Sequence, residues 1–510
     1  MLILTLRRHP VNISKLFALF FLVVTACSGH FETRPDELVV GIENPPTTFD
    51  PRLASDTPSS RINQLIYSRL MTYDDHLNLV PDLLASYEFK PPQTYQFFLK
   101  PGVLFHHGRE LTSEDVRYTL ESLRESGLAS PWQTLWDRIA SLRITGPYSF
   151  EIVLTEPFVP FLSYLTVGIL PSDSGGRILG SGPYRFVRYQ AGEKIVLARY
   201  ESYFGKKPII PNLIFQIIPE DTVRTLELVN KRIDILQNAV PPSLIPYLKK
   251  LPGMTVRSEP GITYHYLGFN LRDPHLGNFK VRQAIAMAID VPSVITYRLA
   301  GMARPATGLL APLHRAYRPD VTTYPYNPEK ARLLLDEAGF PDPDGLGPQS
   351  RFRITYKTST KRDRIGVAHL VSNYLESVGI EVQVLSYEWG RFFQEITQGN
   401  FQLYSLNWAG VVEPDIYYTL FHSSQFPPVG DNRGFFKSGE VDRLTAEARQ
   451  TLDPEKRKEL YSKIQKIVAL TLPAVSLWYE DNVVAFHEGI EGYTLRPDAS
   501  YLGLVQTTKK

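Results

Sequence analysis

The chain has 510 residues, of which 43% are hydrophobic and 21% charged, and its formal net charge is +2. This balance is typical of a globular protein and excludes a disordered chain or a strongly basic one suited to nucleic acid. The length is sufficient for two or three domains. Cys27 is the only cysteine, so intrachain disulfides and cysteine-ligated zinc sites are excluded as well.

The first 26 residues have the layout of a secretory signal. A cationic start precedes an apolar run from Leu16 to Ala26, which is shorter than the roughly 20 residues that a membrane span needs. Cys27 follows small residues at a position that resembles a lipobox. We expect residues 1–26 to be a lipoprotein signal peptide, Cys27 to carry the lipid and residues 27–36 to form a tether. The alternative is an ordinary signal peptide with an incidental cysteine.

The first half of the remaining chain predicts short strands separated by turns. Glu37–Ile42 is a continuous apolar run typical of a buried strand, and residues 61–71 have apolar residues at helical spacing. Thr112 and Asp115 have the spacing of a capping box, so we expect a helix to begin there. Further strands are predicted over 95–99, 142–145, 149–154, 180–186, 193–200 and 214–219, and a helix over 222–230.

The second half alternates strands with longer helices. An apolar stripe predicts a helix over 279–290, and Asn327-Pro328 predicts the start of another that ends near Gly339. This alternation indicates α/β or mixed α+β lobes. Also predicted are strands over 352–356 and 381–385 around a helix over 364–378, strands over 401–407 and 473–486, and one or two helices over 440–469.

Catalytic motifs are missing from the sequence. It contains neither a phosphate-binding loop nor a Gly-x-Ser-x-Gly nucleophile motif. His106, His107 and Glu110 could offer metal ligands, but nothing in the sequence indicates the further ligands that a metal site needs. We interpret them as a loop after a strand, and we expect no enzyme activity, no metal and no cofactor.

A series of short motifs covers most of the chain after residue 27. The segment Phe279–Asp290, which follows Leu267–Asn270, resembles the signature of the peptide-type (family 5) solute-binding proteins of ABC importers. Each motif alone has low specificity, but six or more in the family order are strongly indicative. The other motifs are 79–85, 98–105, 111–116, 180–184, 324–339 and Glu413-Pro414.

The resemblance implies a mixed α/β fold with two lobes that close on a ligand about a hinge. It also implies that the first lobe is discontinuous and includes an extra β-rich subdomain. We expect the first lobe and its subdomain over 37–262, the second lobe over 263–478, and a return to the first lobe over 479–510.

The resemblance also implies where the ligand binds. Trp389 and Trp408 match tryptophans that face the cleft in oligopeptide-binding relatives; burial in a lobe core is the alternative. Arg362 matches a position at the far end of the ligand, where its guanidinium could clamp a carboxylate, or it is a solvated loop charge. Pro46, Thr47 and Asn270 match positions near the ligand backbone, with ordinary turn chemistry as the alternative. The full set of predicted contacts is Pro46, Thr47, Asn270, Arg362, Trp389, Trp408, Ala409, Gly410, Val411 and Glu413.

One departure from the family pattern puts standard peptide binding in doubt. Oligopeptide and dipeptide receptors carry an aspartate shortly after the second tryptophan, and it pairs with the peptide's ammonium group. Val411 and Val412 occupy that neighbourhood in this sequence. A buried ammonium without a carboxylate costs several kcal/mol. Either Glu413 or Asp415 takes the role, or the ligand has no free α-amine; Glu413, in the Glu-Pro motif, is more readily interpreted as structural.

We therefore predict a monomeric, lipid-anchored receptor outside the cytoplasmic membrane that captures a peptide-like solute and delivers it to the membrane subunits of an ABC permease. Nucleic acid is not expected as a partner. The same fold could bind a sugar, an opine, a nickel chelate or haem. A sensor or chaperone-like interaction protein is a further alternative, and a cell-surface hydrolase is the least favoured one.

Overall fold

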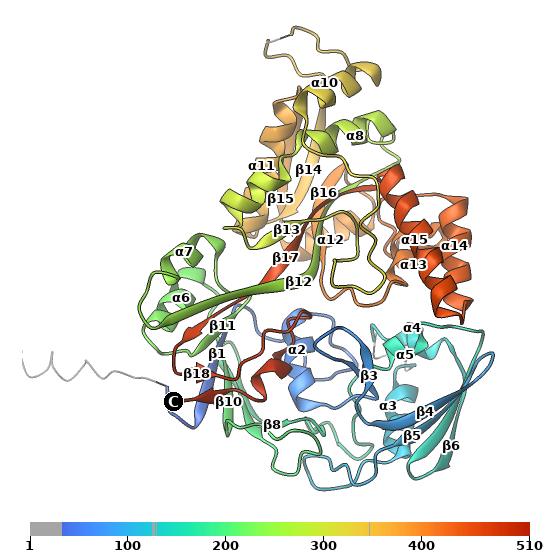
Figure 1. Ribbon diagram of the computed structural model, residues 1–510, viewed down its shortest axis with the longest axis vertical. Helices are drawn as coiled ribbons and strands as arrows, with labels where there is room; N and C mark the ends of the chain where they lie inside the picture. Colours follow the sequence, from blue (N-terminus) through green and yellow to red (C-terminus); the bar gives the residue numbers. More distant parts are fainter. Residues whose placement is uncertain (1–32, 125–127, 129, 346) are drawn as a thin grey trace, which may run out of the picture.

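The computed structural model describes residues 33–124, 128, 130–345 and 347–510. Two lobes are joined by two long antiparallel strands, β12 (Met254–Phe269) and β17 (Ala474–His487), which cross from one lobe to the other (Figure 1). A mixed sheet continues through both crossing strands in the order β15-β14-β16-β12-β17-β11-β1-β10-β9-β8, with β13 (Ala303–Pro305) paired to β17. The two-lobed mixed α/β fold that the family resemblance implied is confirmed.

The first lobe is built on the part of this sheet around β1 (Glu37–Ile42). β1 pairs in parallel with β10 (Asn212–Ile217) and β11 (Ile235–Gln237), and β10 continues antiparallel into β9 (Lys194–Arg199). The run Leu38–Val40 is buried because both faces of β1 are covered. The other elements here are β8 (Tyr184–Gln190), α2 (Thr57–Ile66), α6 (Asp221–Val229), η1 (Pro242–Leu244), α7 (Ile245–Leu248), β18 (Ile490–Glu491), η4 (Tyr501–Leu504) and β19 (Thr508–Lys509).

The helix predicted over 61–71 was wrong in its bounds. Asp56 caps the first turn by accepting a hydrogen bond from the Ser59 N–H, so α2 begins at Thr57. The chain is already extended at Tyr67, because the Ile66 carbonyl accepts a hydrogen bond from the Gly182 N–H (2.9 Å). The apolar spacing continued past the helix end because the next residues are also buried, as a β-bridge and β2 (Met71–Tyr73).

The β-rich subdomain is a four-stranded antiparallel sheet in the order β4-β5-β7-β6. Its core holds aromatic rings in contact, with Phe97 and Phe150 stacked at 5.0 Å between ring centres. The predicted strands over 142–145 and 149–154, which pair as a hairpin, and the helix that begins after Thr112 are confirmed. Bounds in this part of the chain are β3 (Leu79–Pro81), β4 (Leu84–Lys90), β5 (Thr94–Leu99), α3 (Ser113–Ser122), α4 (Gln133–Trp136), β6 (Ile139–Gly146), β7 (Ser149–Leu154) and α5 (Phe161–Tyr164).

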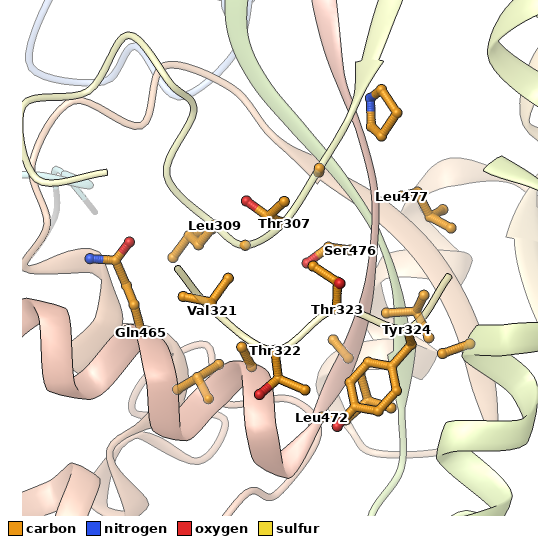
Figure 2. Close-up of a pocket in the computed structure, with 18 of the residues that line it drawn as sticks. Thr307, Leu309, Val321, Thr322, Thr323, Tyr324, Gln465, Leu472, Ser476 and Leu477 are labelled. Atoms are coloured by element: carbon orange, nitrogen blue, oxygen red, sulfur yellow. The ribbon is translucent and has the colours of Figure 1, made fainter. Parts of the chain in front are cut away.

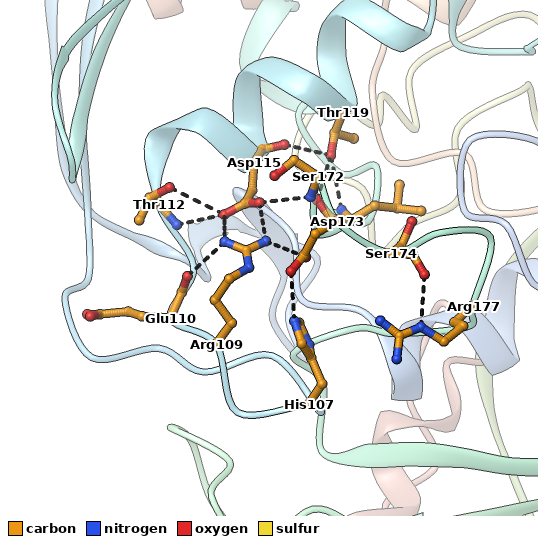
Figure 3. A network of polar contacts seen from close by, with 11 residues as sticks. His107, Arg109, Glu110, Thr112, Asp115, Thr119, Ser172, Asp173, Ser174 and Arg177 are labelled. Atoms are coloured by element: carbon orange, nitrogen blue, oxygen red, sulfur yellow. Dashed lines mark hydrogen bonds and ion pairs between the residues drawn. The ribbon is translucent and has the colours of Figure 1, made fainter.

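A polar network fixes the start of α3 (Figure 3). The Asp115 carboxylate accepts hydrogen bonds from the Thr112 N–H (2.9 Å) and the Ser172 N–H (2.9 Å), and the Arg109 guanidinium binds both of its oxygens. His107 and Arg109 both contact Asp173 at the edge of the network. In the described part of the chain, no group of three or more His, Cys, Asp or Glu side chains is placed to hold a metal ion.

The second lobe carries helices on both faces of its part of the sheet (Figure 1). β14 (Phe352–Ser359) and β15 (Ile380–Tyr387) are parallel and flank α11 (Arg362–Glu376), which confirms the predicted β-α-β unit. Its remaining elements are α8 (Phe279–Ala288), α9 (Val291–Ser293), η2 (Val294–Arg298), α10 (Pro328–Glu337), α12 (Trp389–Thr397), β16 (Leu403–Trp408), α13 (Ile416–Phe421), η3 (Ser423–Gln425), α14 (Gly439–Gln450) and α15 (Pro454–Thr471).

The two lobes are in contact at separate places. Lys361 of the second lobe forms an ion pair with Glu43 of the first (2.9 Å), and the Val159 N–H donates to the Arg449 carbonyl (2.8 Å). Leu77 of the first lobe packs into an apolar cluster of the second. The structure is therefore a closed form of the clamshell. The predicted lobe boundaries at 262–263 and 478–479 stay predictions, since β12 and β17 belong to both lobes.

The predicted signal segment and Cys27 lie outside the described residues. Among the helices that the structure describes, none has the length and apolar character needed to cross a membrane.

Candidate binding cleft

The closed lobes enclose a cavity of about 400 Å³ next to the crossing strands. Its wall combines the two lobes with the crossing strands themselves. Arg61 comes from α2 of the first lobe, His265 and Glu480 come from β12 and β17, and Arg364 and Asn407 come from the second lobe. A cavity that both lobes line can hold a ligand only while the lobes are close together, so this cavity is the candidate site.

The crossing strands form a polar and aromatic wall. The His265 ring stacks on Trp478 (5.2 Å between ring centres), and its Nε2–H donates to Glu480 Oε2 (2.8 Å). The Glu480 side chain is 53% exposed toward the cavity. Although desolvation between the lobes opposes its ionisation, the His265 hydrogen bond and the nearby Lys361 and Arg61 hold the pKa of Glu480 below its ordinary value. The wall therefore presents a carboxylate at neutral pH.

Arg364 lies in the first turn of α11 and lines the cavity. Its Nη2–H donates to Asn407 Oδ1 (2.9 Å), and the guanidinium carbon lies 5.4 Å from the centre of the Trp389 ring. Trp389 is 48% exposed and stacks on Phe393 as the first residue of α12. Trp389 thus supports a cavity residue, although its own ring does not line the cavity.

Of the segment from Trp408 to Glu413, only Ala409 lines the cavity. Trp408 ends β16 half-buried, with the Arg433 guanidinium 5.1 Å from its ring centre, and it lines a smaller space of about 40 Å³ deeper in the second lobe. Gly410 is exposed and has a φ of +67° that favours glycine. Val411 is only 3% exposed and belongs to the apolar core.

The two carboxylates that follow Val411 are engaged inside the second lobe. Glu413 pairs with Arg457, and Asp415 forms a two-point ion pair with Arg449 (2.8 and 2.9 Å). Burial raises the pKa of Glu413 above its ordinary value. Neither side chain lines the cleft, so the segment after Trp408 offers no carboxylate to the cavity.

Comparison with known proteins decides the class of this cleft. The profile described as "Bacterial extracellular solute-binding proteins, family 5 Middle" matches residues 78–427. The chain belongs to family 5 of the bacterial extracellular solute-binding proteins. Family 5 members are extracytoplasmic binding proteins, so this chain is a solute-binding protein of the ABC-transport class and not an enzyme.

Two relatives and one solved structure illustrate the match of this family 5 chain. The oligopeptide-binding protein AppA of Bacillus subtilis is 27% identical over 533 residues, which cover 96% of this chain and 97% of AppA. The glutathione-binding protein GsiB of Shigella dysenteriae is 27% identical over 504 residues, with 94% and 96% covered. The solved structure of AppA from Bacillus subtilis in complex with a nonapeptide superimposes with a TM-score of 0.80 at 27% identity, covering 93% of this chain and 99% of that one.

Several residues that the family 5 resemblance singled out lie away from the cavity. Pro46 is buried, and the Thr47 N–H donates to Ser59 Oγ (2.9 Å) in the turn before α2. Asn270 Nδ2 donates to the carbonyls of Gly399 (3.1 Å) and Phe401 (2.8 Å), so its amide holds the end of β12. Arg362 opens α11 with an exposed side chain near Glu220.

Most of the polar residues that line the cavity of this family 5 protein were not predicted from the sequence. Four distant segments, α2, β12, α11 and β17, bring together Arg61, His265, Arg364, Trp478 and Glu480. One signal was present in the sequence: Glu480 and Asp481 place two adjacent charges within a mostly apolar strand, which indicates a function for charges at that point.

A second cavity, of about 310 Å³, lies wholly within the second lobe of this family 5 chain. A long strap of chain, residues 306–326, covers it against α15 and β17, and its lining is mostly apolar (Figure 2). Ser476 already shares a hydrogen bond with the Tyr264 hydroxyl (2.8 Å). Because only one lobe lines this cavity, lobe closure does not act on it, and we assign solute capture to the cleft.

Proposed function

We propose that this protein captures a peptide or peptide-like solute by lobe closure and delivers it to the membrane subunits of an ABC permease. The observation that carries the proposal is the cavity between the closed lobes, whose wall takes charged side chains from both lobes. The relatives named for oligopeptide and glutathione binding support the peptide class.

The size and chemistry of the cavity suit a small polar ligand. A space of about 400 Å³ is at the lower end of the range typical of small-molecule sites. The main-chain amides of a short peptide need hydrogen-bonding partners, and its two charged ends need groups of the opposite sign. Asn407, Arg61 and Glu480 offer these groups, while Trp478 offers an aromatic surface.

Anchoring belongs to the same proposal. Acylation of Cys27 would keep the receptor on the outer side of a membrane, close to a permease that needs repeated delivery, and the chain is expected to act as a monomer. Growth of an expressing strain with radiolabelled palmitate tests this: the wild-type chain takes up label and Cys27→Ala does not. Label on Cys27→Ala would contradict anchoring at this residue.

The solute itself is tested by native mass spectrometry of the soluble chain without its first 27 residues. We expect an added mass that matches a short peptide, either retained from the expressing cell or bound from a mixed di- and tripeptide library. A thermal shift with the same library gives an independent readout, because a ligand that binds only the folded state raises Tm. Binding of a non-peptide solute, with no member of the library bound, would contradict the peptide class.

A further inference from the structure

The second cavity, beneath the strap of residues 306–326, exceeds an ordinary packing defect. Its volume of about 310 Å³ is about twice that of an engineered apolar cavity, roughly 150 Å³, which binds benzene. Protein interiors are close-packed, and an empty apolar space loses dispersion contacts around its wall. The size therefore indicates a ligand of about two rings.

The wall of the second cavity favours a neutral ligand with rings. Arg318 is the one charged residue on this wall within the part of the chain that the structure describes, and its guanidinium pairs with Asp320 (3.0 Å). An ionised ligand would lose water there without gaining a carboxylate or a free cation as partner. Aromatic residues pack well against aromatic ligands. Those on the wall are Tyr264, Tyr317, Tyr324, Tyr326, Tyr417 and Phe421.

One buried amide on the wall keeps an unused acceptor. Gln465 of α15 is only 6% exposed, and its Nε2 donates to the carbonyls of Ala316 (2.8 Å) and Tyr461 (3.1 Å). These two hydrogen bonds fix the orientation of the amide, and its Oε1 has no donor among the described residues. The amide stands at one end of the cavity, with its oxygen on the side of Leu309 and its nitrogen turned away (Figure 2). A ligand N–H or O–H can donate to this oxygen.

The second cavity and the cleft lie on opposite faces of the crossing strands. Tyr264 and Ser476 line the second cavity, whereas their neighbours His265 and Trp478 line the cleft. Successive residues of a strand point to opposite faces of its sheet. The two spaces can therefore be filled at the same time.

The strap can admit a ligand because its outer part is loosely held. Residues 318–326 form no main-chain hydrogen bond with main-chain groups of the described residues. Side chains bind this part to α15: Asp320 pairs with Lys466 (2.8 Å), and the Tyr324 hydroxyl donates to the Leu470 carbonyl (3.0 Å). Few hydrogen bonds must break for the strap to lift, so the cavity can open without unfolding the lobe.

We propose that the second cavity binds a neutral aromatic molecule of about two rings that carries an N–H or O–H donor, and that it does so without lobe closure. The donor bonds Gln465 Oε1, and the rings lie among the apolar residues under the strap. This site is separate from the cleft, so the inference goes beyond the proposed function and does not depend on it.

Isothermal titration calorimetry of the purified protein with indole measures this binding. Indole has two fused rings, one N–H donor and no charge, so we expect a single molecule to bind. Indole-3-acetamide and indole-3-acetate are matched in size and differ in charge. The acetate should bind at least tenfold more weakly at pH 7, because the wall offers its carboxylate no unpaired cation. Equal binding of this pair, or no binding of indole, would overturn the inference.

Filling the cavity from either wall should weaken indole binding tenfold or more. Ala469→Phe adds a ring from α15, and Val321→Phe adds one from the strap; both residues line the cavity. Ala446→Phe is the matched control, because Ala446 is exposed on α14 outside the cavity, and it should keep the wild-type affinity. Urea unfolding without ligand identifies the folded variants. Wild-type affinity for indole in a folded cavity-filling variant would contradict the assignment.

The cleft provides the last control. Indole should leave the radius of gyration of ligand-stripped protein unchanged in X-ray scattering, and it should bind equally well in the presence of the peptide library. Compaction by indole, or competition with the library, would place indole in the cleft and refute a second site. If the library does not bind, the proposed peptide function fails, while loss of indole binding in Ala469→Phe or Val321→Phe still supports the second cavity.

Discussion

Placing an aspartate at Val411 should damage the fold and should not restore an ammonium site. Val411 is 3% exposed in the apolar cluster of the second lobe, so Val411→Asp loses the burial of an aliphatic side chain and places a carboxylate among apolar groups. The first effect costs roughly 1.5–3 kcal/mol and the second several kcal/mol more. We expect a loss of unfolding free energy of about 4 kcal/mol or more.

The pH dependence of this loss identifies the buried charge. Burial should raise the pKa of the new carboxyl in the folded state above the roughly 3.9 of the unfolded state. The unfolded chain then releases its proton first as pH rises, so Val411→Asp becomes less stable relative to wild type from about pH 4 upward. Urea unfolding of both chains at several pH values measures the difference.

Two matched variants complete this test. In Val411→Asn the new side chain has nearly the shape of aspartate but cannot ionise, so the loss of unfolding free energy should not change with pH. Ala409→Asp places the carboxylate on an exposed residue that lines the cleft, and its stability should stay within about 0.5 kcal/mol of wild type. If Val411→Asp unfolds at the same urea concentration as wild type, the assignment of Val411 to the core is refuted.

Three further substitutions test other parts of the structure. Burial lowers the pKa of His314 to about 4, and its ring forms hydrogen bonds with the backbone. The unfolded chain therefore binds the proton first as pH falls below about 6.5, and the free energy of unfolding decreases toward pH 4. His314→Gln should flatten this part of the pH profile of stability, measured by urea unfolding. Arg449→Met leaves buried Asp415 without its cation and should lower the free energy of unfolding, measured in urea, by about 3–5 kcal/mol. Adding Asp415→Asn should recover part of this loss. Unchanged stability of Arg449→Met would contradict the buried pair. Lys361→Met removes the partly exposed ion pair with Glu43 between the lobes, which is worth about 0–1 kcal/mol. The fraction of molecules in the closed form should therefore fall at most about fivefold. A smaller mean radius of gyration in X-ray scattering would contradict this.

Local sequence patterns predicted most individual elements. The apolar run of β1, the capping box before α3 and the β-α-β unit around α11 all follow from signals within about 25 residues, which is why periodicity found them. The bounds of α2 were missed because its end depends on a hydrogen bond from Gly182, far along the chain. The two-lobed arrangement was predicted through the family resemblance, since periodicity does not show how strands cross between lobes.

The candidate site was predicted less completely than the fold. The segment around Trp408 and Ala409 was placed next to the cleft, but which side chains turn into the cavity depends on packing. Val411 turns into the core, whereas Arg364, two residues beyond the predicted Arg362, turns toward the cavity. Glu480 faces His265 only because β12 and β17 pair in one register. Such contacts between distant segments have no local sequence signal.

Small-angle X-ray scattering on ligand-stripped protein, before and after a bound solute is returned, tests the central claim most directly. Stripping by unfolding and refolding removes retained solute, and native mass spectrometry verifies its loss and return. Lobe closure on a solute in the cleft predicts a larger radius of gyration in the stripped protein and a return to the compact value with saturating solute. A radius of gyration that does not change while the solute binds would contradict capture by closure.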